Sequence, residues 1–136
     1  MKLPVLAILL LALAGCATTP VPISEATPVP AARHLAFKSP GVGTAPVVIR
    51  RDSGFQASAC ATQVFVNGAL AAYIRSGEIV TLHVPAGAVI FGAMADAICA
   101  GGLVEKQATL TAGTTTHFRI GYDTNGALGL YVTATR

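Results

Sequence analysis

Few side chains in this sequence can do chemistry, and they lie far apart. The 136 residues include three cysteines, three histidines and six acidic residues. No G-x-S-x-G sequence offers an activated serine, and no C-x-x-C pair offers a redox dithiol. No helical pattern follows the glycine-rich stretches Gly41–Gly43 and Gly101–Gly102, so neither predicts a phosphate-binding loop. We therefore expect a protein that is not an enzyme and holds no cofactor.

The histidines and carboxylates form no evident site. His83 and His117 each lie in an alternating, strand-like segment, so we expect both on solvent faces. Two histidines on adjacent strands could bind a metal, but no third ligand has an evident position. Asp52 and Asp123 lie in turn sequences, where a carboxylate accepts backbone N–H groups. No spacing singles out a carboxylate pair for glycoside hydrolysis.

The first cysteine ends a short apolar segment at the N-terminus. Lys2 precedes an apolar run that is shorter than the about 20 residues of a membrane-spanning helix, as is typical of a signal peptide. The run ends in Leu13-Ala14-Gly15-Cys16, which resembles the lipobox of bacterial lipoproteins. The resemblance implies that residues 1–15 are removed and that Cys16 carries the acyl chains of a membrane anchor. An ordinary secretory signal with an incidental cysteine is the alternative.

The residue after the lipidated cysteine bears on location. In lipoproteins of this kind an Asp at that position favours retention in the inner membrane. The chain has Ala17 there. The resemblance therefore implies a protein that is anchored by lipid in the outer membrane and faces the periplasm.

Acylation of Cys16 leaves Cys60 and Cys99. Two cysteines in an oxidising envelope compartment are expected to pair. The bridge would close a loop of about 40 residues, worth ~4 kcal/mol in the chain-entropy model. A metal pair or a redox dithiol is the alternative, but no cluster of histidine or acidic residues accompanies either cysteine. We predict a structural disulfide.

The charge of the chain is low once the signal segment is removed. Residues 16–136 are 121 residues, one domain's worth, with 8 basic and 6 acidic side chains. That balance is too weak and too scattered for a nucleic-acid surface, so we expect no nucleic-acid partner. Arg50-Arg51 is the only basic pair, and we interpret it as a solvated strand end.

Proline divides the chain into two parts. Six of the eight prolines lie in residues 17–46, where they disfavour helix and central strand. We predict that residues 16–45 are the lipidated cysteine and a Pro-rich tether, semi-extended from Ala17 to Pro30 at ~3.1 Å per residue. Leu35 and Phe37 lie in a short segment that could dock on the domain. The folded domain is then residues 46–136.

After Pro46, short β-branched or alternating segments are separated by turn sequences. Asn67-Gly68 is the strongest hairpin signal, because a type I′ turn needs positive φ at both central residues. Turn signals every 8–12 residues and no helical period predict an all-β antiparallel sandwich of about seven or eight strands. We predict strands at residues 47–51, 63–66, 69–74, 78–84, 88–94, 103–111, 114–122 and 127–135.

The turn motifs of residues 37–94 are similar to those of a known group of proteins. Val64-Phe65-Val66-Asn67-Gly68, followed by Val84-Pro85-Ala86-Gly87, resembles small bacterial lipoproteins with a domain of unknown function related to PEGA-type sandwiches. The resemblance implies a sandwich fold and essentially no activity. Ala86-Gly87 replaces the more usual Pro-Gly, and the pair of Cys60 and Cys99 is a departure from the pattern.

These patterns together predict a non-catalytic outer-membrane lipoprotein. Its tethered β-sandwich would bind another envelope protein or support an envelope assembly. The alternative is a small periplasmic binding or inhibitor module that acts on a cell-wall ligand or a lytic enzyme. The chain has the size and the cysteines for that alternative, but no convincing inhibitory motif. No pattern indicates which residues bind a ligand.

Overall fold

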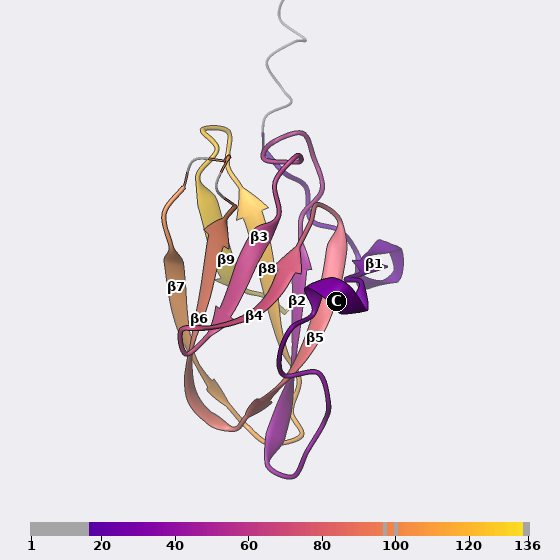
Figure 1. The fold of residues 1–136 in the computed structure, drawn as a ribbon, viewed down its shortest axis with the longest axis vertical. Coiled ribbons are helices and arrows are strands. Elements are labelled where there is room, and N and C mark those ends of the chain that lie inside the picture. The colour runs from indigo at the N-terminus through magenta and orange to yellow at the C-terminus, as the bar shows by residue number, and fades with distance from the viewer. Residues whose placement is uncertain (1–16, 97, 100, 135–136) are drawn as a thin grey trace, which may run out of the picture.

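The computed structural model describes residues 17–96, 98–99 and 101–134, which form two packed β-sheets (Figure 1). One sheet has five strands in the order β1-β5-β2-β8-β9, and the other has four in the order β4-β3-β6-β7. No helix in this part of the chain is long and apolar enough to cross a membrane. The prediction of an all-β sandwich is confirmed. The signal segment at residues 1–15 and the anchor at Cys16 lie outside the described residues.

The strands follow the predicted segments closely. The short 3₁₀ turn η2 (Ile23–Glu25) precedes the two-residue strand β1 (Thr27–Pro28), and a second 3₁₀ turn, η3 (Ala31–Arg33), follows it. The longer strands are β2 (Thr44–Arg51), β3 (Thr62–Val66), β4 (Ala69–Ile74), β5 (Glu78–Pro85), β6 (Gly87–Ala95), β7 (Val104–Leu110), β8 (Thr116–Tyr122) and β9 (Leu128–Val132).

The prediction of a wholly antiparallel sandwich is wrong, because two pairs of strands are parallel. β2 pairs in parallel with β8, and β1 pairs in parallel with β5. Parallel neighbours need a long connection between them. Here the chain leaves β2, forms β3 and β4 of the other sheet, returns to the first sheet as β5, forms β6 and β7, and rejoins the first sheet as β8.

Side-chain alternation places the core between the sheets. Val47 and Ile49 of β2 are fully buried, as are Phe91 of β6 and Phe118 of β8. The rings of Phe91 and Phe118 meet across the sheets with centroids 4.7 Å apart, in a tilted arrangement. Burial of such apolar side chains is the main term that holds the two sheets together.

The two ends of the sandwich differ in their connections (Figure 1). The hairpin end carries residues 38–43, 67–68, 86 and 111–115. The loop end carries residues 17–19, 52–61, 75–77, 123–127 and the described residues of 96–103. At the hairpin end, Asn67 and Gly68 have φ values of 47° and 79°, as the predicted type I′ turn requires. A register shift beside Val64 adds one residue to β4, which the sequence did not predict.

Residues 17–37 lie along the sandwich instead of extending away from it as a tether. Thr19 forms a β-bridge with Ser53, and the Val29 N–H donates to the Ile79 carbonyl at 2.9 Å. The N–H groups of Leu35 and Ala36 both donate to the Ala71 carbonyl of β4. An extended Pro-rich chain suits this position, because an edge strand offers carbonyls and does not need every N–H in return.

The predicted docking of Leu35 and Phe37 is borne out in part. Phe37 packs against the core, and its carbonyl accepts the His83 N–H of β5 at 2.8 Å. Leu35 remains 45% exposed. Since Ala71 belongs to one sheet and His83 to the other, this segment closes one side of the sandwich.

Candidate functional site

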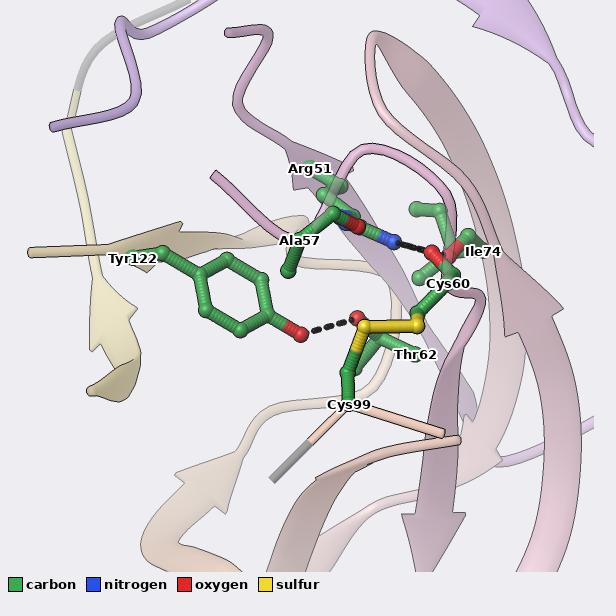
Figure 2. Close-up of a disulfide and its surroundings, with 7 residues drawn as sticks. All are labelled: Arg51, Ala57, Cys60, Thr62, Ile74, Cys99 and Tyr122. Atoms are coloured by element: carbon green, nitrogen blue, oxygen red, sulfur yellow. Dashed lines mark hydrogen bonds between the residues drawn. A yellow bond between two sulfur atoms is a disulfide. The ribbon is translucent and has the colours of Figure 1, made fainter. Parts of the chain in front are cut away.

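A disulfide joins two loops at the loop end of the sandwich. Cys60 lies just before β3, and Cys99 lies between β6 and β7, with Cα atoms 6.2 Å apart. That separation is within the range that a disulfide spans without backbone movement. Beside the bridge, the hydroxyls of Thr62 and Tyr122 share a buried hydrogen bond of 2.9 Å (Figure 2). The disulfide prediction is confirmed, and neither cysteine is a free thiol in this structure.

Arg51 is a buried cation next to the disulfide, with only 1% of its surface exposed. Its Nη1 donates to the carbonyls of Cys60 at 2.5 Å and Ile74 at 3.1 Å, and its Nη2 donates to the Ala57 carbonyl at 2.5 Å (Figure 2). The guanidinium carbon lies 5.1 Å from the centre of the Tyr122 ring, a cation–π contact. Burial lowers the pKa of Arg51. The Arg51 side chain therefore contacts the loop of residues 52–61, the end of β4 and the Tyr122 ring at the same time.

The prediction that Arg50 and Arg51 form a solvated strand end is wrong. They are 2% and 1% exposed. Strand alternation places Arg51 on the inward face with Val47 and Ile49. Arg50 points to the outer face, where its Nη1 donates to the Val21 carbonyl of the N-terminal segment at 2.9 Å.

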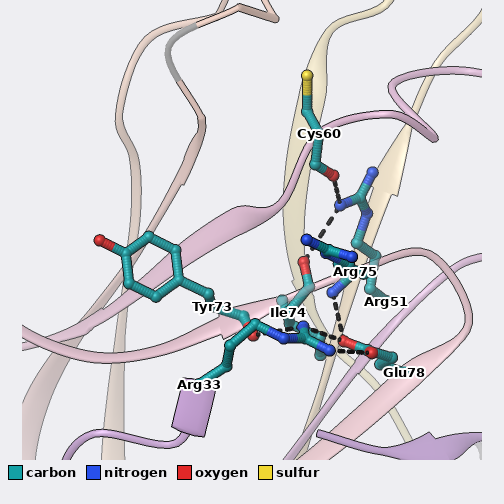
Figure 3. A network of polar contacts seen from close by, with 7 residues as sticks. All are labelled: Arg33, Arg51, Cys60, Tyr73, Ile74, Arg75 and Glu78. Carbon is teal, nitrogen blue, oxygen red and sulfur yellow. Dashed lines mark hydrogen bonds and ion pairs between the residues drawn. The ribbon is translucent and has the colours of Figure 1, made fainter. Parts of the chain in front are cut away.

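A second polar cluster fastens the N-terminal segment to both sheets (Figure 3). Arg33 of η3 donates from both Nη atoms to the Glu78 carboxylate of β5, at 2.7 and 2.5 Å. Arg33 also donates to the Tyr73 carbonyl of β4 at 3.2 Å. Two parallel bonds between a guanidinium and a carboxylate are the stronger form of this interaction. The cluster thus joins η3 to β5 of the five-stranded sheet and to β4, an edge strand of the four-stranded sheet.

Glu78 is held in its ionised form by this cluster. Burial acts to raise its pKa, but the hydrogen bonds and charges of Arg33 and Arg75 outweigh burial. One of those bonds comes from the Arg75 backbone N–H, at 2.7 Å. The pKa of Glu78 therefore lies below its ordinary value of 4.5.

We expected Asp52 to be a simple turn residue, but it is buried on the outer side of the five-stranded sheet. Its Oδ1 lies 3.1 Å from Arg119 Nε, a charge contact without the alignment of a hydrogen bond. The Thr18 hydroxyl donates to its Oδ2 at 3.2 Å. A Cβ at Gly121 would lie 2.7 Å from that oxygen, so only glycine leaves room for the carboxylate. Burial is the largest influence and raises the pKa of Asp52, although Arg119 and Thr18 act to lower it.

The other predicted turn carboxylate behaves as expected. The Oδ1 atom of Asp123 accepts the backbone N–H groups of Asn125 and Ala127, at 2.8 and 2.9 Å. These bonds shape the connection between β8 and β9. Asp123 therefore has a local structural role.

The histidines do not come together as a metal site. β2 lies between β5 and β8, so His83 and His117 are not on adjacent strands. His83 instead shares a shallow groove of about 330 Å³ with His34 and Lys38. Burial lowers the pKa of His34, and its Nε2 has no hydrogen-bond partner within the described part of the chain. Among the described residues, no group of three or more His, Cys, Asp or Glu could hold a metal ion.

The outer face of the four-stranded sheet carries an apolar surface. Leu103 is 51% exposed and Ile90 is 44% exposed. A Cβ at Gly92 would lie 3.2 Å from the Leu103 side chain and 3.3 Å from Phe65, so the glycine lets these two side chains approach each other across β6. A groove of about 150 Å³ lies on the same face and is lined by Phe65, Gly68, Met94, Leu103 and Glu105. We call Phe65, Ile90, Met94 and Leu103 the apolar face.

Two large apolar side chains project from the loop end. Phe55 is 84% exposed and Ile98 is 83% exposed. A shallow pocket of about 260 Å³ at the same end is lined by Gln56, Ala57, Cys99, Asn125 and Gly126. The described residues of this lining include the side-chain amides of Gln56 and Asn125, which can donate and accept hydrogen bonds.

Comparison with known proteins gives no family for the chain. No protein-family model matches it, and no curated protein or solved structure is significantly similar to it. The resemblance to PEGA-type sandwiches therefore remains a prediction.

Arg50, Arg51, Asp52, Thr62 and Glu78, the buried polar residues, all contact partners within the fold, while the apolar face and the loop end expose large apolar side chains. Sequence reasoning missed Arg51, Asp52 and the Arg33–Glu78 pair as organising residues. Alternation with Val47 and Ile49 could have placed Arg51 inside. The polar groups of these buried residues thus hold the N-terminal segment and the loop end in place.

Proposed function

We propose that this chain is a non-catalytic lipoprotein of the bacterial outer membrane whose β-sandwich binds another envelope protein. The anchor is Cys16, on the evidence of the Leu13-Ala14-Gly15-Cys16 sequence. The Cys60–Cys99 disulfide supports an oxidising compartment such as the periplasm. Ala17 after the cysteine supports the outer membrane over the inner membrane.

The observation that carries the binding role is the difference between the two outer faces of the sandwich. The N-terminal segment crosses the five-stranded sheet, where it contacts Arg50 and Asp52. The corresponding face of the four-stranded sheet leaves Ile90 and Leu103 about half exposed around a groove. An exposed apolar patch with polar residues at its rim, here Glu105, is typical of a protein-binding surface.

The anchor is tested by mass spectrometry and fractionation. The mature N-terminus should be an acylated Cys16, and Cys16→Ala should release the protein from the membrane fraction. A Cys16→Ala protein that stays firmly in the membrane would contradict the anchor.

The binding surface is tested by site-specific photocrosslinking in intact cells. A benzophenone amino acid at Phe65 or Leu103 should give a discrete adduct, and Ile90→Glu in the same chain should abolish it. Thr81, exposed on the outer face of β5, is the matched control position and should give no such adduct. Equal crosslinking at Thr81 and Leu103, or none at either apolar position, would contradict the proposed surface.

A further inference from the structure

We propose that the loop end faces the membrane and that Phe55 inserts into the bilayer surface. The inference rests on the proposed acylation of Cys16. It adds an orientation and a second membrane contact, neither of which the anchor alone implies.

The chain next to the proposed anchor is held against the loop that carries Phe55. The Thr19 N–H donates to the Ser53 carbonyl at 2.7 Å, and the Ser53 N–H donates back to the Thr19 carbonyl at 3.0 Å. The Thr18 N–H donates to the Tyr122 carbonyl at 3.0 Å. A Cβ at Gly54 would lie 3.2 Å from the Thr18 Cα, so the two backbones are in contact.

This contact leaves no spacer between the proposed anchor and the sandwich. Cys16 is bonded to Ala17, and Phe55 is bonded to Gly54. Each of these covalent steps spans about 3.8 Å between Cα atoms. Acyl chains on Cys16 would therefore bring the 52–61 loop to the membrane surface, while the hairpin end points away from it.

The side chains at this end suit a bilayer surface. Phe55 and Ile98 are 84% and 83% exposed. Residues 53–61, 97–104 and 124–127 contain no charged side chain, so their approach to lipid would desolvate no charge of their own. The charged residues of the loop end, Asp52, Arg75, Asp96 and Asp123, lie outside these three segments. Single exposed apolar residues are common on soluble proteins. The position of Phe55 beside the proposed anchor is what points to lipid as its partner, because apolar side chains bury in the boundary between headgroups and acyl chains.

The hairpin end provides a matched comparison. Val42 is fully exposed there, like Phe55 at the loop end. The eight residues of β2 separate the two positions, a distance of about 25 Å at the usual rise per residue. A membrane contact through the loop end should reach Phe55 and leave Val42 in water.

The experiment uses the absence of tryptophan from the chain. Phe55→Trp and Val42→Trp are made in the full chain, acylated in cells, and reconstituted into phosphatidylcholine vesicles with or without brominated acyl chains. Ile98→Trp provides a second probe of the loop end, in case Phe55→Trp alters the loop. Mass spectrometry of each sample reports acylation of Cys16 separately from fluorescence.

We expect the Phe55→Trp and Ile98→Trp proteins to lose most of their emission in brominated vesicles and to emit at shorter wavelength. The Val42→Trp protein should keep its emission. Acylated protein in which neither loop-end probe is quenched would overturn the inference and leave the anchor intact, as would equal quenching of all three probes. A mass without acyl chains would overturn the anchor and this inference together.

Discussion

At the hairpin end, β3 turns into β4 through Asn67 and Gly68, and β5 turns into β6 through Ala86 alone. At the loop end, ten residues separate β2 from β3, and eight separate β6 from β7. The short turns are fixed by backbone conformation, which Asn and Gly supply locally. The loop of residues 52–61 has carbonyls that accept hydrogen bonds from the Arg51 side chain, and the Cys60–Cys99 disulfide joins this loop to a residue 39 positions away. The same architecture therefore depends on local sequence at one end and on contacts between distant residues at the other.

Loss of the disulfide should lower the free energy of unfolding more than any other change, because it removes the covalent link within the loop end. Replacement of Cys60 and Cys99 by alanine removes a constraint on residues 39 positions apart. We expect a loss of up to about 4 kcal/mol in the free energy of unfolding. Urea unfolding of residues 17–136 measures it, with reduction of the wild type as an independent route to the same loss. If the double variant unfolds at the wild-type midpoint, the bridge does not stabilise the loop end.

Arg51→Met should cost somewhat less. The carbonyls of Ala57, Cys60 and Ile74 lose their shared donor, while removal of a buried charge offsets part of that loss. We expect a net loss of about 2–4 kcal/mol. Lys106→Met, at an exposed cation of β7, is the control and should stay within about 0.5 kcal/mol of wild type in the same urea unfolding. Equal stability of the two variants would show that the loop end does not depend on this donor.

Gly68→Val tests the hairpin end. Valine would have to adopt the positive φ of 79° that glycine holds there. We expect a loss of about 1–3 kcal/mol from backbone strain. Asn67→Asp should be nearly silent, because its Oδ1 can still accept the Ile90 N–H. A Gly68→Val protein that melts with the wild type in denaturant would contradict the view that local conformation fixes this end.

Glu78→Gln should have the smallest effect and the one that depends on pH. The folded pKa of Glu78 is lower than its ordinary value of 4.5. Its ionised form therefore adds stability above pH 4.5, and that contribution disappears as pH falls through the folded pKa. We expect wild type to exceed Glu78→Gln by about 1–2 kcal/mol at pH 7, with the difference shrinking below pH 4.5. A difference that grows on acidification would contradict the assigned direction.

The strands could be predicted from the sequence because their signals are local. Alternation and turn residues gave the eight longer strands to within a few positions, and the cysteine count gave the disulfide. The parallel pairing of β2 with β8 depends on the path of the whole chain, so no local pattern contained it. The contact of Asp52 with Arg119 follows from that pairing and could not be predicted either. Composition alone suggested a free tether, because nothing local in a Pro-rich segment reveals that Arg33 meets Glu78.

Amide hydrogen exchange of the N-terminal segment tests most directly whether residues 17–37 belong to the folded unit. The N–H groups of Thr18, Thr19, Thr27 and Val29 all donate to carbonyls of the sandwich. We predict that these amides exchange orders of magnitude more slowly than in an unfolded chain, with protection comparable to that of β5. Exchange of all four at the rate of an unfolded peptide would show that the segment is a free tether, and that the loop end is not held next to residue 16.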